Sequence, residues 1–275
     1  MKKAIKLLLF LTLIGAGLEA GGYTYGLQPS IFIKSTFTNS NLKENLLQKY
    51  SFKILFNDLK ENKLSQIKKS SEKNEIDLHG LNYNIEKYIA LKSLSEATSK
   101  YPEKLINKNI DFIYLLKAID YYGINVGGIY NYEKKSIFIS TKYKKYNTNK
   151  SKHTIASIFH HEFSSILIKK YELSENDWIN SSGKDFLYKS DEDPFYYTIY
   201  IQGNSEKIKN KDLYKRGLIK HYAETGVEND FNTYAEVIFT NPKKMKKLIS
   251  QYPVIKRKYE VFKSFYMSID EGFAP

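Results

Sequence analysis

Apolar residues recur at helical intervals in the second half of the chain. In the segment Thr154–Tyr171 they form one stripe along a predicted helix, which Thr154 can cap. The Asn241-Pro242 pair marks a boundary between two later segments, because a residue before proline avoids the helical conformation. The same spacing predicts further helices over Asp230–Phe239, Lys243–Gln251 and Tyr259–Met267.

A different pattern lies between residues 102 and 141. Ile110–Leu116 is a dense apolar run, whereas Ser136–Thr141 alternates between polar and apolar residues as a strand does. Asn131–Lys135 separates that strand from Ile129-Tyr130 by a gap of hairpin size. We therefore expect one strand and a β-hairpin just before the long helix.

Residues 39–100 are polar and rich in lysine, with apolar residues at helix-like intervals. This pattern predicts a small helical region, with a loop around Lys68–Glu75. The expected fold class is α+β, in which a short sheet with a hairpin is followed by helices. The expected organisation is a targeting segment at 1–20, a helical region at 21–100 and the main domain at 101–275.

The first residues have the pattern of a secretory signal peptide. Met1–Lys6 is positively charged, Leu7–Leu18 is almost wholly apolar, and small residues follow. We expect export to a periplasmic or extracellular location. The alternative is an uncleaved N-terminal anchor that associates the protein with a membrane or envelope. A lipoprotein is excluded, because the chain has no cysteine to acylate.

Composition narrows the chemistry further. With no cysteine among 275 residues, thiolate catalysis, disulfides and iron–sulfur clusters are excluded, and any metal must be held by the five histidines and by carboxylates. The formal net charge is +13. Its basic residues are almost all lysines spread along the chain, apart from Arg216 and Arg257, so we expect no nucleic-acid partner.

The residues with most chemical potential lie in the middle of the long predicted helix. Glu162 falls among apolar residues on the helical wheel, where a carboxylate is costly unless something pairs with it. His160 and His161 precede it directly. A neighbouring imidazole and carboxylate suit a site in which a metal activates water and the carboxylate takes its proton.

The match to the zinc-protease pattern H-E-x-x-H is partial. Starting from His161, the second histidine position is occupied by Ser165, and starting from His160 it is occupied by Ser164. Taken alone, the segment favours two core or surface histidines beside one buried Glu162. Its context, described next, favours the functional interpretation.

A second element, His221–Phe239, contains Tyr222 and then Glu228, Asn229 and Glu236 on a predicted helix. The order of hairpin, His-Glu helix, tyrosine and glutamate helix resembles the gluzincin-type zinc metallopeptidases, which include the anthrax lethal factor catalytic domain and the Mlc titration factor peptidases. The resemblance covers about Pro102 to Ile269 and implies a zincin-like domain.

The resemblance implies roles for several residues. His161 would be the first metal ligand, with His160 as the neighbouring candidate, Glu162 would be the general base, and Tyr222 would donate a hydrogen bond to the oxyanion. The glutamate ligand is expected seven residues after Tyr222, where this chain has Asn229. Glu228 and Asp230 flank that position as possible substitutes, and Glu236 would be a further ligand or a partner of one. His153 and His221 are additional candidates near the cleft, and His79 is expected at the surface.

The resulting hypothesis is an exported metal-dependent peptidase that uses zinc or manganese and binds a peptide or protein along the hairpin edge. The alternative is a catalytically inactive zincin-like scaffold without metal, which serves as an envelope or extracellular binding protein. Ser165 and Asn229 motivate this alternative, because both replace expected ligands. A lysine-rich surface protein with no site is a third interpretation.

Overall fold

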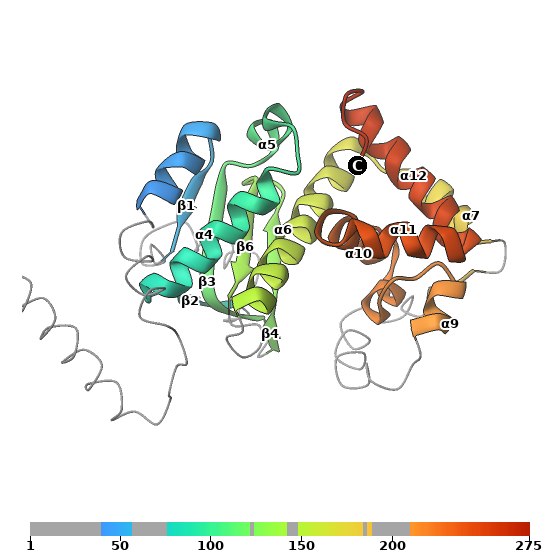
Figure 1. Ribbon diagram of the computed structural model, residues 1–275, viewed down its shortest axis with the longest axis horizontal. Coiled ribbons are helices and arrows are strands. Elements are labelled where there is room, and N and C mark those ends of the chain that lie inside the picture. Colours follow the sequence, from blue (N-terminus) through green and yellow to red (C-terminus); the bar gives the residue numbers. More distant parts are fainter. Residues whose placement is uncertain (1–39, 57–75, 122–123, 142–147, 184–185, 189–209) are drawn as a thin grey trace, which may run out of the picture.

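The structure is a computed structural model that describes residues 40–56, 76–121, 124–141, 148–183, 186–188 and 210–275 (Figure 1). The expected signal segment at 1–20 and the expected loop at Lys68–Glu75 lie outside the described residues. Among the described residues, no helix is both long and apolar enough to cross a membrane.

One mixed sheet contains the strands β1 to β6, and β3 is central to it. β3 pairs in parallel with β1 and β6 and antiparallel with β2 and β4, while β5 pairs antiparallel with β6. The expected β-hairpin is thus confirmed, with β5 at the edge of the sheet. The strand bounds are Lys53–Leu55 (β1), Ile76–Gly80 (β2), Phe112–Tyr121 (β3), Ile124–Val126 (β4), Gly128–Asn131 (β5) and Ser136–Ser140 (β6).

The region between residues 40 and 100 contains helices, as expected, but also two strands. A helix spans residues 40–49 and α4 spans Asn84–Thr98, whereas β1 and β2 join the sheet by pairing with β3. α4 packs against the long helix α6, Thr148–Tyr171. Strands from both sides of residue 100 therefore share one sheet.

The α+β class is confirmed, and helices complete the chain after the sheet. α6 begins before Thr154, so that residue lies inside the helix rather than at its cap. Figure 1 shows α6 standing between the sheet and the C-terminal helices. The remaining helices are α5 (Glu103–Asn109), α7 (Glu175–Ser182), α9 (Asn210–Lys215), the short 3-10 helix η2 (His221–Thr225), α10 (Val227–Thr240), α11 (Pro242–Gln251) and α12 (Pro253–Ile269).

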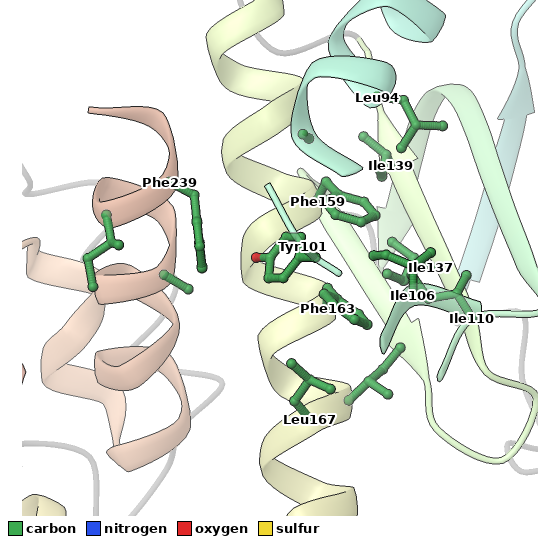
Figure 2. Close-up of a cluster of buried hydrophobic side chains, with 14 of the residues drawn as sticks. Leu94, Tyr101, Ile106, Ile110, Ile137, Ile139, Phe159, Phe163, Leu167 and Phe239 are labelled. Carbon is green, nitrogen blue, oxygen red and sulfur yellow. The ribbon is translucent and has the colours of Figure 1, made fainter. Parts of the chain in front are cut away.

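Aromatic packing holds α6 beside α10. Tyr101 is buried between the two helices, with its ring centroid 4.9 Å from Phe163 on α6 and 4.6 Å from Phe239 on α10 (Figure 2). Phe159 and Phe163 are both fully buried and face the strands of the sheet. Because this core fixes the distance between α6 and α10, it also fixes the polar side chains on their facing surfaces.

Candidate functional site

A hydrogen-bonded group around Glu236 joins α10 to α6. Glu236 Oε1 is 2.9 Å from His161 Nδ1, and its Oε2 accepts a hydrogen bond of 2.6 Å from Ser157 Oγ. Lys220 Nζ also donates to Oε2. Both oxygens of Glu236 are thus occupied, and its place is that of a carboxylate that orients a histidine rather than of a metal ligand.

The charges in this group fix the tautomer of His161. Burial raises the pKa of Glu236, but Lys220 and His161 outweigh burial and bring that pKa down to about 2. An ionised carboxylate only accepts hydrogen bonds, so Nδ1 of His161 carries the proton. Burial lowers the pKa of His161, yet the Glu236 hydrogen bond and the charges of Glu162 and Glu236 leave it raised overall.

Glu162 lies beside this group, pressed against the edge strand. Its residue is 8% exposed, and a Cβ added at Gly128 of β5 would come within 2.6 Å of Glu162 Oε1. Only glycine at this position leaves room for the carboxylate. Burial raises the pKa of Glu162 to about 7, with Glu228 and Glu236 adding to the rise and His161 opposing it.

Glu162→Gln should therefore stabilise the protein at alkaline pH. The folded-state pKa of about 7 lies above the ordinary 4.5, so folding stability falls as pH rises between these two values. The neutral glutamine removes this penalty, which we expect to be on the order of 3 kcal/mol at pH 8 and close to zero at pH 4.5. Urea unfolding at both pH values measures the gain. A gain that is the same at both pH values would contradict the prediction, and the exposed Glu96→Gln serves as the control.

Tyr222 and Glu228 complete the set of predicted residues at this place. The ring centroids of Tyr222 and His161 are 5.7 Å apart. Burial, followed by the charges of Glu162, Glu228 and Glu236, raises the pKa of Tyr222, so its hydroxyl keeps the proton that it can donate. Burial, followed by the charge and hydrogen bonding of Glu228, raises the pKa of Tyr130 on β5. The structure thus brings His161, Glu162, Tyr222, Glu228 and Glu236 together.

Two other candidates point elsewhere. His160 is almost fully buried, with its Nδ1 2.9 Å from the Tyr101 hydroxyl and its ring 5.0 Å from that of Phe239. Adjacent residues on a helix point about 100° apart. Because His161 points toward Glu236, His160 points into the aromatic core. Asp230 likewise faces away from His161 and forms a buried pair with Lys258.

Two of the remaining histidines, His79 and His221, have local partners. His79 Nε2 is 2.8 Å from Asp120 Oδ2 on the sheet, and about half of its side chain is exposed, in line with the expected surface position. His221 Nδ1 is 2.9 Å from Glu224 Oε2. The side chain of His153 lies outside the described residues.

The expected second ligand position is closed by a buried polar pair. Ser165 Oγ accepts a hydrogen bond of 2.7 Å from Asn232 Nδ2, and the two residues are 2% and 0% exposed. Asn229 Nδ2, at the expected glutamate position, donates to Thr225 Oγ1 at 2.7 Å. Sequence reasoning missed Asn232, although its spacing of four residues from both Glu228 and Glu236 places it on their face of α10.

Lys220 and Gly128 were also missed. Lys220 lies in a segment without periodicity, so no sequence signal pointed to it. Gly128 directly precedes the predicted hairpin strand, and its close approach to Glu162 depends on the packing of α6 against β5, which sequence patterns do not show.

A solved structure resembles this chain along most of its length. A structure from Bacteroides caccae, described as a "putative zinc-binding metallo-peptidase", matches over 92% of this chain and 90% of its own length, with a TM-score of 0.52 and 13% sequence identity. The chain has a metallopeptidase-like fold. No protein-family model matches the chain, and no curated protein matches it.

The residues of this chain do not fit the zinc site that such a fold implies. A catalytic zinc site needs three protein ligands and an open position. Within the described ranges, no group of three or more histidines and carboxylates is arranged to hold a metal ion. Glu236 is fully engaged by donors, and Ser165 Oγ accepts a hydrogen bond from Asn232, whose Oδ1 is buried without a partner in the described structure. His161 and the exposed Glu228 are the candidate ligands that remain.

Proposed function

We propose that this protein binds extended peptides on a metallopeptidase-like scaffold without zinc-dependent hydrolysis. The observation that carries the proposal is the Ser165–Asn232 hydrogen bond, since it places a closed, buried pair where a second metal ligand would be needed. Lys220 also supports the proposal. Its ammonium group balances the charge of Glu236, so this carboxylate needs no metal ion as a counter-charge. Glu236 is held by its donors and Ser165 by Asn232, which leaves neither side chain free to bind a metal.

The edge strand β5 is the surface that would receive the peptide. Ser140 N–H donates to Gly127 O at 2.8 Å, and β5 runs antiparallel to β6, so the intervening residues Gly128 and Tyr130 turn their N–H and C=O groups away from β6. In the described part of the chain, no strand pairs with that outer side. An extended peptide could hydrogen-bond there as an added strand.

The location expected from residues 1–20 gives this binding a setting. If the segment directs export, the peptides would be those of the cell envelope or the exterior. Glu162 lies against β5, with Tyr222 close to it, and both would contact the bound backbone or a side chain. The proposal therefore retains peptide binding from the peptidase hypothesis but not metal-dependent hydrolysis.

The test measures metal and peptide on the same untagged protein. We expect less than stoichiometric zinc and manganese by elemental analysis, and saturable binding of a labelled pool of acetylated pentapeptide amides by fluorescence anisotropy. The same pool with alternate backbone N-methylation should not bind, because it cannot complete an added strand. Equal binding of both pools would overturn the edge-strand proposal.

Hydrolysis is the competing function, favoured by the near-neutral pKa of Glu162 beside the His161 imidazole. Mass spectrometry of the peptide pool after incubation with zinc decides between the two. We expect intact peptides. Stoichiometric zinc together with cleavage that Glu162→Gln abolishes would establish the peptidase instead.

A further inference from the structure

Glu162 is a buried carboxylate without a donor of its own. Its residue is more than nine-tenths buried, and in the part of the chain that the structure describes no hydrogen bond or salt bridge to its carboxylate is formed. The cationic neighbour that favours its charged form is His161, whose Nδ1 is committed to Glu236. Buried carboxylates are ordinarily paired within the protein, whereas among the described residues the oxygens of Glu162 have no protein donor and are not sealed from solvent.

Negatively charged and aromatic side chains surround the position from which a donor could reach the Glu162 carboxylate. Glu162 lies against Gly128 on the edge strand, and Glu228 is close enough to raise the pKa of Glu162. The hydroxyl of Tyr130, also on β5, is coupled to Glu228. Glu228 is exposed, and Gly128, Tyr130 and Tyr222 are partly exposed, so the group opens to solvent at its rim.

The cations that the structure describes do not neutralise this group. Lys220 is engaged with Glu236, and His161 is the remaining positive group that acts on Glu162. Lys244 also acts on Glu236, so the two lysines are directed at that carboxylate. Glu162 and Glu228 form the negative part of the group. On a protein of net charge +13, this is a local negative site at the side of a strand edge.

We propose that Glu162 and Glu228 bind an organic cation of the ligand, an alkylammonium or guanidinium group, beside the β5 edge. A charge-assisted hydrogen bond to Glu162 would supply the donor that the fold does not. Tyr130 and Tyr222 present aromatic side chains at the rim, which also suit a cation. The inference rests on the proposed peptide binding and specifies its ligand, a peptide with a lysine, an arginine or a free amino terminus.

The experiment compares three pentapeptides that share an alanine background. One carries a central lysine with both ends blocked, the second replaces that lysine with norleucine, and the third has only alanines with a free amino terminus. We expect the lysine peptide to bind the wild-type protein at least ~10-fold more tightly than the norleucine peptide, as for a charge-assisted hydrogen bond. Tighter binding of the free-amine peptide would assign the site to a peptide terminus.

The Glu162→Gln variant supplies the second arm. The lysine peptide should lose at least ~10-fold in affinity, and the norleucine peptide should lose clearly less, because it carries no cation for Glu162 to bind. The control is Glu96→Gln on the exposed side of α4, which makes the same charge change and should alter neither affinity. Equal affinity of the lysine and norleucine peptides for wild type, with no effect of Glu162→Gln, would overturn the cation site but leave peptide binding intact.

A small probe separates the two proposals from each other. n-Butylammonium and n-butylguanidinium should raise the melting temperature of the wild type but not of Glu162→Gln. If they do so while no peptide binds, the cation site stands and the strand-edge function fails. If neither the amines nor the peptides bind, both proposals are wrong.

Discussion

Lys258→Met should destabilise the protein by about 3–5 kcal/mol, because it leaves a buried carboxylate without its counter-charge. Lys258 and Asp230 are both 0% exposed, and Lys258 Nζ donates to Asp230 Oδ2. Trp178 Nε1 and the Tyr188 hydroxyl donate to the same oxygen at 3.0 and 2.7 Å. These neutral donors remain in the variant, but they do not carry a charge.

Burial raises the pKa of Asp230 and lowers that of Lys258, so desolvation opposes the charge on each partner. The double variant Lys258→Met with Asp230→Asn should therefore recover most of the loss, since the asparagine oxygen still accepts from Trp178 and Tyr188 without a charge. Urea unfolding at pH 7 of the single and double variants measures the coupling. A double variant as unstable as Lys258→Met alone would show that the charge is not the cause.

The control for this cycle lies on the same helix. Lys256 on α12 is exposed, so Lys256→Met removes a lysine of the same helix without burying an unpaired charge. We expect its stability to stay within about 0.5 kcal/mol of the wild type. The pair matters to the site because Asp230 begins the part of α10 that carries Asn232 and Glu236.

Periodicity predicted the elements around the site well. α6, α10, α11 and α12 were expected from apolar spacing, and the hairpin β5–β6 from alternation and turn length. Their ends were less predictable, because α6 continues toward the N-terminus through polar residues that carry no apolar signal. The strands β1 and β2 were not predicted, for a different reason. Each is short, and both are defined by pairing with β3, which is distant in sequence.

Within the site, sequence order located the residues but not their contacts. His161, Glu162, Tyr222, Glu228 and Glu236 could be named because motif spacing fixes which helix face each residue shares. Glu236 could have been either a metal ligand or a partner of His161. The contact of Lys220, the residue before η2, with Glu236 decides for the second role. Pattern analysis cannot predict such a long-range cation.

The buried polar pair at the expected second ligand position comes from both helices. On α6 the second histidine position holds Ser165, and on α10 the facing position holds Asn232. If α10 had a carboxylate opposite Ser165, the interior would be more polar. If α6 had a histidine opposite Asn232, the interior would be more crowded. The serine and asparagine join α6 and α10 through one buried hydrogen bond, although Asn232 Oδ1 has no partner in the described structure.

Introducing ligands at Ser165 and Asn232 should create zinc binding. In the double variant Ser165→His with Asn232→Asp, the introduced imidazole would lie four residues after His161 on the same face of α6, opposite the new carboxylate on α10. Four-ligand zinc sites bind with about 10–16 kcal/mol, or roughly 3 kcal/mol per ligand, so each added ligand should raise the affinity about 100-fold. Isothermal titration with zinc measures the gain, and adding His161→Ala to the double variant should reverse it. Tight zinc binding by the wild type, unchanged in the double variant, would show that the Ser165–Asn232 pair does not prevent metal binding.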